Sequence, residues 1–195
     1  MSQARLYRAL TVISMAFGRG PAARAVATSA ELSSDDRVVD IGCGPGAAVR
    51  EAASRGSSAT GVDPDLSMLR LARWISAARR ARNVNWLEGS AASVPLPDAT
   101  ATVVWAVSSA HHWPESVAGW AEARRLLAPG GRLLVAERLT PPGARGHAAH
   151  GLTRDGADRL AAELAAAGFS RVQAEVIKAG RRRLVVVRCA LPSAA

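Results

Sequence analysis

Lysine is almost missing from this sequence of 195 residues: Lys178 is the only one, and arginine carries nearly all of the positive charge. The net charge of +9 and the pI of about 11.3 could indicate nucleic-acid binding. The arginines are scattered, however, and their short clusters at 79–82 and 181–183 contain no aromatic residues that could stack on bases. We therefore interpret the charge as a solvated basic surface and do not expect a nucleic-acid partner.

Cysteine is scarce as well, since Cys43 and Cys189 are the only two. Two cysteines cannot build a disulfide framework, so we expect reduced thiols and a cytoplasmic location. No Cys/His group along the chain has the spacing of a zinc site, and we expect no metal. No apolar run approaches the roughly 20 residues of a membrane span, and the apolar stretch near the N-terminus is short for a signal peptide, so we expect an amphipathic helix there.

Strand-like and helix-like segments alternate along the rest of the chain. The expected strands cover 37–41, 59–63, 83–88, 101–107 and 132–137, with turns at 108–113 and 128–131. The expected helices cover 3–17, 21–31, 47–54, 64–80, 114–127 and 153–168, and a hairpin of 169–177 with 183–189 follows. This alternation predicts an α/β fold, a Rossmann-like doubly wound seven-stranded sheet that is mostly parallel with an antiparallel C-terminal hairpin. Residues 1–34 would be helices covering the site, and 35–195 one compact domain.

The most informative stretch is VVDIGCGPGA, residues 38–47, where an apolar strand ends in Asp40 and alternating glycines follow. A P-loop is excluded because no Gly-Lys-Ser/Thr follows the glycines. A dinucleotide site is harder to dismiss, because residues 42–47 fit G-x-G-x-x-G/A and Asp63 ends the next strand about 20 residues later. The motif alone does not discriminate between ligands.

Three observations favour a ligand that has a ribose and a cationic amino-acid tail but no phosphate. Asp40 would repel a pyrophosphate and would suit an ammonium group. Pro45 removes one N–H from any anion-binding turn. Tyr7 is the only tyrosine, so the Tyr-x-x-x-Lys proton relay of a dehydrogenase is impossible after the fourth strand.

At this point the sequence resembles the class I S-adenosylmethionine-dependent methyltransferases, in particular the ubiquinone/menaquinone-methyltransferase-like group. VVDIGCGPG is similar to their first motif and GVDPDLSMLRLAR to their second. EGSAASVPLPDATATVVWAVSSAHHW resembles the third and fourth, and LLAPGGRLLVAE and HGLTRDGADRLAAELAAAGF resemble later elements. The resemblance covers residues 37–190 in the right order. It implies that S-adenosylmethionine is the cofactor and S-adenosylhomocysteine the product.

The resemblance also implies roles for individual residues. Asp40 and the turn would hold the amino-acid tail, Asp63 would accept the ribose hydroxyls, and the remaining residues would flank the adenine or line the methyl side. The implied cofactor-binding residues are Asp40, Gly42, Cys43, Gly44, Gly46, Asp63, Pro64, Met68, Ser90, Ala91 and Ser108. Two positions depart from the family, which commonly has Asp where this chain has Ser90 and Thr102, and the first departure implies weaker adenine recognition.

On the acceptor side, His111 and His112 stand where a general base would lie, after the fourth strand. They could instead cap the helix starting at Pro114 or pack against Trp113, and His147 and His150 could also reach the substrate. The expected function is methyl transfer to a small lipophilic or aromatic acceptor by O- or C-methylation. An RNA or protein methyltransferase and a non-catalytic cofactor-binding protein remain alternatives, and the chain could be a monomer or a homodimer.

Overall fold

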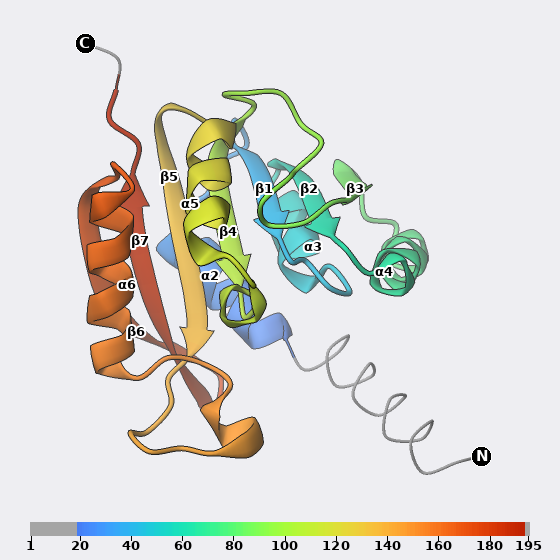
Figure 1. Cartoon of the computed structure of the whole chain (residues 1–195). Coiled ribbons are helices and arrows are strands. Elements are labelled where there is room, and N and C mark those ends of the chain that lie inside the picture. The colour runs from blue at the N-terminus through green and yellow to red at the C-terminus, as the bar shows by residue number, and fades with distance from the viewer. Residues whose placement is uncertain (1–18, 194–195) are drawn as a thin grey trace.

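The computed structural model describes residues 19–193, apart from the side chains of residues 147 and 148. Seven strands form one sheet in the order β3-β2-β1-β4-β5-β7-β6 (Figure 1). Strands β1 to β5 are parallel, whereas β7 runs antiparallel to both β5 and β6. The predicted fold is therefore confirmed. The strands are β1 Arg37–Ile41, β2 Ser58–Asp63, β3 Val84–Glu88, β4 Ala101–Val107, β5 Leu127–Arg138, β6 Ser170–Ala179 and β7 Arg182–Ala190.

Helices cover both faces of the sheet, and the middle of its central strands is accordingly apolar. On one face, α2 (Gly20–Ser29), α3 (Ala47–Ser54) and α4 (Leu66–Ala78) share a core with Trp105 of β4. On the other face, α5 (Ser116–Leu126) and α6 (Arg154–Ala166) pack against Ile41 and Val104. In Figure 1, α5 and α6 lie in front of the sheet and α2 lies behind it. Because a core packs on each face of the sheet, the ends of its strands have fixed positions.

Side-chain caps set the starts of two helices, α4 and α6. Asp65 caps α4 by accepting a hydrogen bond from the Ser67 N–H, and Thr153 caps α6 by accepting one from the Gly156 N–H. The prediction that Pro114 lies in the first turn of its helix was wrong, because Glu115 is the N-cap of α5 and Pro114 precedes it. The helix predicted over residues 3–17 lies outside the described residues.

Strand β5 is longer than predicted. The expected turn at 128–131 lies inside it. Leu127 pairs with Ala101 of β4, the register then shifts, and regular pairing with β4 resumes at Arg132. Two short 3₁₀ helices also occupy segments that were expected to be a turn and a loop: η1 covers Ala110–His112 and η2 covers Gly146–Ala149. Neither difference alters the sheet topology.

The strand order places the candidate site. The chain proceeds from β1 outward to β3, then returns to the other side of β1 to form β4 and β5, so the order reverses between β1 and β4. Open α/β sheets bind ligands at such a reversal, beyond the carboxyl ends of the strands. Asp40, Asp63 and Ser108 all lie at that edge. None of the helices in the described part of the chain is long and apolar enough to cross a membrane.

Candidate functional site

Asp40 lies at the carboxyl end of β1 and is only 2% exposed. It pairs in register with Trp105 of β4, so the two side chains are neighbours on one face of the sheet. Among the described residues, neither Asp40 Oδ1 nor Trp105 Nε1 has a hydrogen-bond partner. Burial raises the pKa of Asp40 to about 8, the charge of Arg19 opposes that rise and the charge of Asp63 adds to it. The nearby Trp105 N–H also opposes the rise, although its geometry is too poor for a hydrogen bond. An unpaired buried carboxylate is costly, so the group stays mostly protonated at neutral pH, and a cationic or hydrogen-bonding ligand would favour its ionised form.

The glycine turn after β1 has no backbone donor left for a ligand. The N–H groups of Gly42 and Cys43 both donate to Val62 O, at 2.8 and 3.0 Å. The Gly44 N–H donates to Asp63 Oδ2 at 2.8 Å, and the Gly46 N–H donates to Cys43 O at 2.9 Å. Pro45 has no N–H at all. The turn itself therefore offers no free N–H to a phosphate, and only the first N–H groups of α3 remain as backbone donors here.

The glycines themselves are required by backbone geometry and by close packing. Gly42 has a φ of 75°, and a Cβ there would lie 2.6 Å from Ser109 Cβ. Gly44 has a φ of 51°, but no atom of the described chain lies within 4 Å of a Cβ built on it. Arg50 of α3 stabilises the turn, because its Nη1 donates a hydrogen bond to Pro45 O at 2.7 Å. Space beside Gly44 is thus open to a ligand, whereas Gly42 faces packed protein.

Asp63 ends β2 beside this turn and is 8% exposed. Its Oδ2 accepts the Gly44 N–H, and its Oδ1 accepts the Asp65 N–H at 2.9 Å. The N-cap of α4 is Asp65, so the lone pairs of Asp63 are not used to cap that helix. A carboxylate offers about four lone-pair positions, and two backbone bonds leave capacity for two hydroxyls. The arrangement is compatible with the predicted ribose contact.

The residues predicted to flank an adenine lie around the ends of β2 and β3. Pro64 is exposed and Met68 is half-buried in the first turn of α4. Ser90 is exposed, and Ala91 next to it is half-buried, in a tight turn where Ser90 and Ser93 exchange backbone hydrogen bonds of 3.0 and 3.2 Å. Strands β2 and β3 are parallel neighbours, so these groups share the edge that carries Asp63.

The surroundings of Cys43 and Thr102 indicate structural roles for both residues. Cys43 is buried, and burial raises the pKa of its thiol well above the usual range, so a nucleophilic role is disfavoured. Thr102 lies at the opposite edge of the sheet, where its hydroxyl donates to Asp36 Oδ1 at 2.7 Å. An acid at position 102 would bring two carboxylates together, which accounts physically for the threonine in this chain.

His111 is held by a buried carboxylate that the sequence analysis missed. Its Nδ1 lies 2.8 Å from Oε2 of Glu137, whose side chain is 1% exposed at the end of β5, whereas the His111 side chain is 18% exposed. The rings of His111 and His112 lie 3.9 Å apart between centroids, and the His150 ring lies 5.5 and 5.6 Å from them. Burial lowers the pKa of His112, and the neighbouring His111 and His150 lower it further.

Of the two alternative roles for the histidines, the structure contradicts capping of α5. The N-cap of α5 is Glu115, so the histidines do not cap that helix. Trp113 packs on Trp120 of α5, with ring centroids 4.7 Å apart. Beside the histidines is a cavity of about 400 Å³. Its lining includes His111, His112, His150, Ser108, Glu137, Pro21, Ala22, Arg19, Arg138, Arg181 and Arg182.

Three residues of this site escaped sequence reasoning: Glu137, Trp105 and Arg19. Glu137 could have been found, because it is an acid that ends an apolar strand, as Asp40 and Asp63 are. Trp105 is indistinguishable from an ordinary core residue in a buried strand. Arg19 lies between two glycines directly before α2, and burial lowers its pKa against the opposing charges of Asp40 and Glu137. Only the fold brings it to the site.

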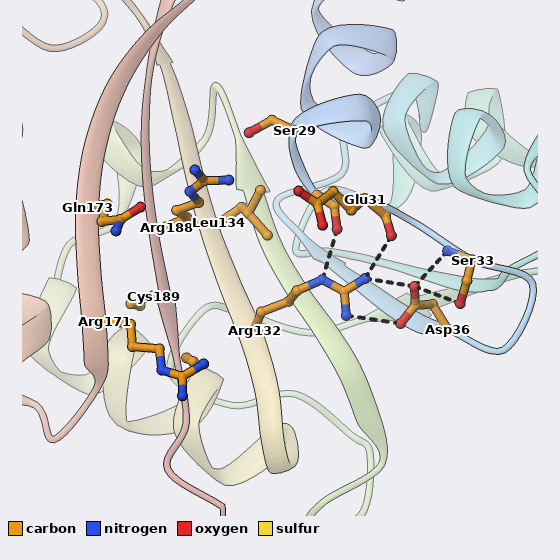
Figure 2. A pocket seen from close by; sticks show the side chains of 12 residues that line it. Ser29, Glu31, Ser33, Asp36, Arg132, Leu134, Arg171, Gln173, Arg188 and Cys189 are labelled. Atoms are coloured by element: carbon orange, nitrogen blue, oxygen red, sulfur yellow. Dashed lines mark hydrogen bonds and ion pairs between the residues drawn. The ribbon is translucent and has the colours of Figure 1, made fainter.

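A second cavity, of about 520 Å³, lies at the amino ends of the parallel strands, far from these residues (Figure 2). There Arg132 donates to Asp36 Oδ2 at 2.7 Å, and the Ser33 N–H donates to the same oxygen at 2.8 Å. Figure 2 shows Arg132 directed at Asp36, with Arg171 and Gln173 across the cavity. Ligands of open α/β sheets bind at the other edge, so we interpret this network as structural.

The fold and the buried acids at its carboxyl edge define a Rossmann-like α/β protein with a candidate ligand site where the strand order reverses. Residues 39–135 match the family described as methyltransferase domain. The rifamycin-modifying enzyme "27-O-demethylrifamycin SV methyltransferase" of Amycolatopsis mediterranei is 37% identical over 112 residues, which are 55% of this chain and 40% of that protein. A demethylmenaquinone methyltransferase of Tropheryma whipplei is 31% identical over 114 residues, 58% of this chain and 46% of that protein.

Solved structures agree on the fold. The crystal structure of a SAM-dependent methyltransferase from Aquifex aeolicus superposes with a TM-score of 0.73 at 19% identity, covering 85% of this chain and 87% of that one. The sequence match and the shared fold indicate a class I S-adenosylmethionine-dependent methyltransferase domain over residues 39–135, similar to the menaquinone-methyltransferase-like enzymes. The chain spans less than half of the length of the two curated relatives.

Proposed function

We propose that this chain transfers a methyl group from S-adenosylmethionine to a small molecule bound in the cavity beside His111 and His112. The single observation that carries the proposal is the buried Asp40 oxygen without a partner, next to a turn whose backbone donors are all occupied. A cationic group satisfies such a carboxylate, whereas a phosphate does not. The bound cofactor would supply an activated methyl group and an α-ammonium group.

Each residue at the carboxyl edge then has a defined task. Asp40 binds the ammonium group, and Asp63 uses its remaining lone pairs to accept the ribose hydroxyls. Gly44 leaves room for the amino-acid tail, because a side chain there would project into open space. Pro64 and Met68 on one side, and Ser90 and Ala91 on the other, contact the adenine. Ser108 lines the methyl side of the same cavity as the histidines.

The proposed acceptor carries an oxygen or an acidic carbon, which His111 or His112 contacts as a proton acceptor. Glu137 fixes His111 through Nδ1, so the Nε2 atom is the one left to act on the acceptor. Four arginines in the lining favour an acceptor that also carries an anionic group. The cover was predicted over residues 1–34, of which residues 1–18 lie outside the described residues. Arg19, Pro21 and Ala22 border the cavity, which supports a covering role for the N-terminal region.

Calorimetric titration of the full chain with S-adenosylmethionine, S-adenosylhomocysteine and NAD tests the proposal. We expect both sulfur compounds to bind with one site per chain and NAD not to bind. Binding of NAD alone would overturn the assignment. Turnover with a panel of quinols, phenols and hydroxylated carboxylic acids then separates a methyltransferase from a cofactor-binding protein without catalytic activity.

An RNA-directed reaction is favoured by one observation, a second basic groove of about 460 Å³ that Arg24, Arg50, Arg79, Arg80 and Arg82 line. This groove lies over α3 and the end of α4, away from the histidines. Arginine grooves bind phosphate backbones in a salt-dependent manner. Salt-dependent binding of a duplex RNA, together with methylation of that RNA, would replace the small-molecule assignment.

A further inference from the structure

Three histidine side chains from two separate loops converge at the carboxyl edge of the sheet. His111 and His112 belong to η1 after β4, and His150 follows η2 after β5. One ring nitrogen from each lies within 4.8 Å of the others. Because the histidines lie about 40 residues apart in sequence, the expectation of no metal, which rested on spacing along the chain, could not detect them.

Glu137 gives this cluster the arrangement typical of metal-binding histidines. A histidine that binds a metal usually donates its other ring nitrogen to a carboxylate, which fixes the ring and its tautomer. His111 makes this contact through Nδ1, 2.8 Å from Glu137 Oε2, and Nε2 is the nitrogen left for a metal. The main chain adds a longer contact of 3.4 Å from the His111 N–H to Glu137 Oε1. The buried Glu137 therefore holds η1 in place through both of its oxygens.

We propose that His111, His112 and His150 bind one divalent transition-metal ion of the zinc class, with Glu137 as the positioning carboxylate. Three imidazoles suit Zn²⁺, Co²⁺ or Ni²⁺, and three protein ligands leave a fourth position open. Zinc–nitrogen bonds of about 2.0–2.1 Å in a tetrahedral site place the nitrogens about 3.4 Å apart. Rotation of the exposed His112 and His150 side chains would bring the observed separations of up to 4.8 Å to that value, while Glu137 holds His111.

The open position faces the cavity that the same histidines line. Arg19, Arg138, Arg181 and Arg182 also line this cavity, so an anionic oxygen bound to the metal would face cationic side chains. This part of the inference rests on the proposed function, because it makes the fourth ligand an oxygen of the methyl acceptor. An imidazole nitrogen that binds a metal cannot also accept a proton, so metal binding would replace the role of histidine as a base. Cofactor binding by Asp40 and Asp63 does not depend on it.

The experiment uses the full chain without an affinity tag, stripped of metal by a chelator. Zn²⁺ is titrated calorimetrically, and Co²⁺ is titrated by visible absorption, where a tetrahedral site gives intense bands and an octahedral one gives weak bands. We expect one equivalent of either ion to bind and Co²⁺ to give tetrahedral bands. Substitution H150A should weaken metal affinity at least tenfold, and E137Q should weaken it about 10- to 100-fold.

The matched control is E51Q, which removes a carboxylate that pairs with Arg55 on α3, away from the cluster. E51Q should bind Zn²⁺ as the unchanged chain does. Failure to bind one equivalent, octahedral Co²⁺ bands, or unchanged affinity in H150A would overturn the proposal. Titration of S-adenosylhomocysteine into the metal-free protein keeps the two proposals apart. Cofactor binding without metal binding overturns only the metal site, and metal binding without cofactor binding overturns only the proposed function.

Discussion

Replacing Asp40 by asparagine tests the assignment on which the cofactor site depends. The amide has nearly the same shape but no charge, so Asp40→Asn removes the proposed partner of the ligand ammonium without creating a cavity. Loss of one partner of a buried charge pair costs about 2 to 5 kcal/mol. We therefore expect the affinity for S-adenosylhomocysteine, measured by calorimetry at about pH 7.5, to fall about 30-fold or more.

The pH dependence of binding carries the sharper signature. Burial raises the pKa of Asp40 to about 8, so the carboxyl group of the ligand-free protein is mostly protonated at neutral pH. Binding of an ammonium group requires the carboxylate, and a proton must leave. Between about pH 7.5 and about pH 6 the affinity of the unchanged chain should fall about 25-fold, about 2 kcal/mol, while the affinity of Asp40→Asn stays flat.

Stability should respond in the opposite direction. A carboxyl group whose pKa is higher in the folded state than in the unfolded state stabilises the fold at low pH, and this stability is lost as pH rises toward the folded pKa. The unfolding free energy of the ligand-free chain should thus fall between about pH 4 and about pH 8, and Asp40→Asn should lack this decrease. The variant is then more stable than the unchanged chain at about pH 8, by at most about 5 kcal/mol from the size of the pKa shift.

A matched substitution, Asp36→Asn, controls for the general effect of removing a buried acid. Asp36 is 6% exposed and lies directly before β1, but Arg132, Thr102 and Ser33 already satisfy it at the opposite edge (Figure 2). Asp36→Asn should lower stability and leave cofactor affinity unchanged. Cofactor affinity that does not change in Asp40→Asn, or that does not depend on pH in the unchanged chain, would refute the reasoning.

Two further predictions separate ligand contacts from structural ones. Asp63→Ala should weaken S-adenosylhomocysteine binding by about 1 to 3 kcal/mol, because buried acceptors are lost. The control Asp65→Ala should cost about 1 kcal/mol of stability through loss of the α4 cap and leave the affinity unchanged. Full affinity in Asp63→Ala would contradict the ribose assignment. Gly42→Ala should unfold or strongly destabilise the chain, because its Cβ would meet Ser109. Gly44→Ala should cost only about 1 to 2 kcal/mol of stability from its left-handed backbone, yet weaken cofactor binding. If thermal melts and calorimetry showed the same loss of stability and affinity for Gly42→Ala and Gly44→Ala, the open space beside Gly44 would be contradicted.

The sequence could predict the elements whose signals are local. Strand β1 and helix α3 have the predicted bounds, because an apolar run and a glycine turn fix both ends of each. Strand β5 was underestimated, since the pairing of Leu127 with Ala101 depends on a strand 26 residues away in the chain. The contact between His111 and Glu137 likewise requires β4 and β5 to be neighbours, and the position of His150 depends on a loop. Neither follows from periodicity.

Four acids among the described residues are buried, all at or near strand ends, and their partners give them different chemistry. Asp36, at the start of β1, is fully satisfied by an arginine, a hydroxyl and a backbone N–H. Asp63 has two backbone bonds and spare lone pairs, which suits hydroxyl donors. Glu137 is committed to His111 and so controls that ring. Asp40 alone among these four has a buried oxygen with no partner among residues 19–193, so its charge is the one for which a cationic ligand is needed.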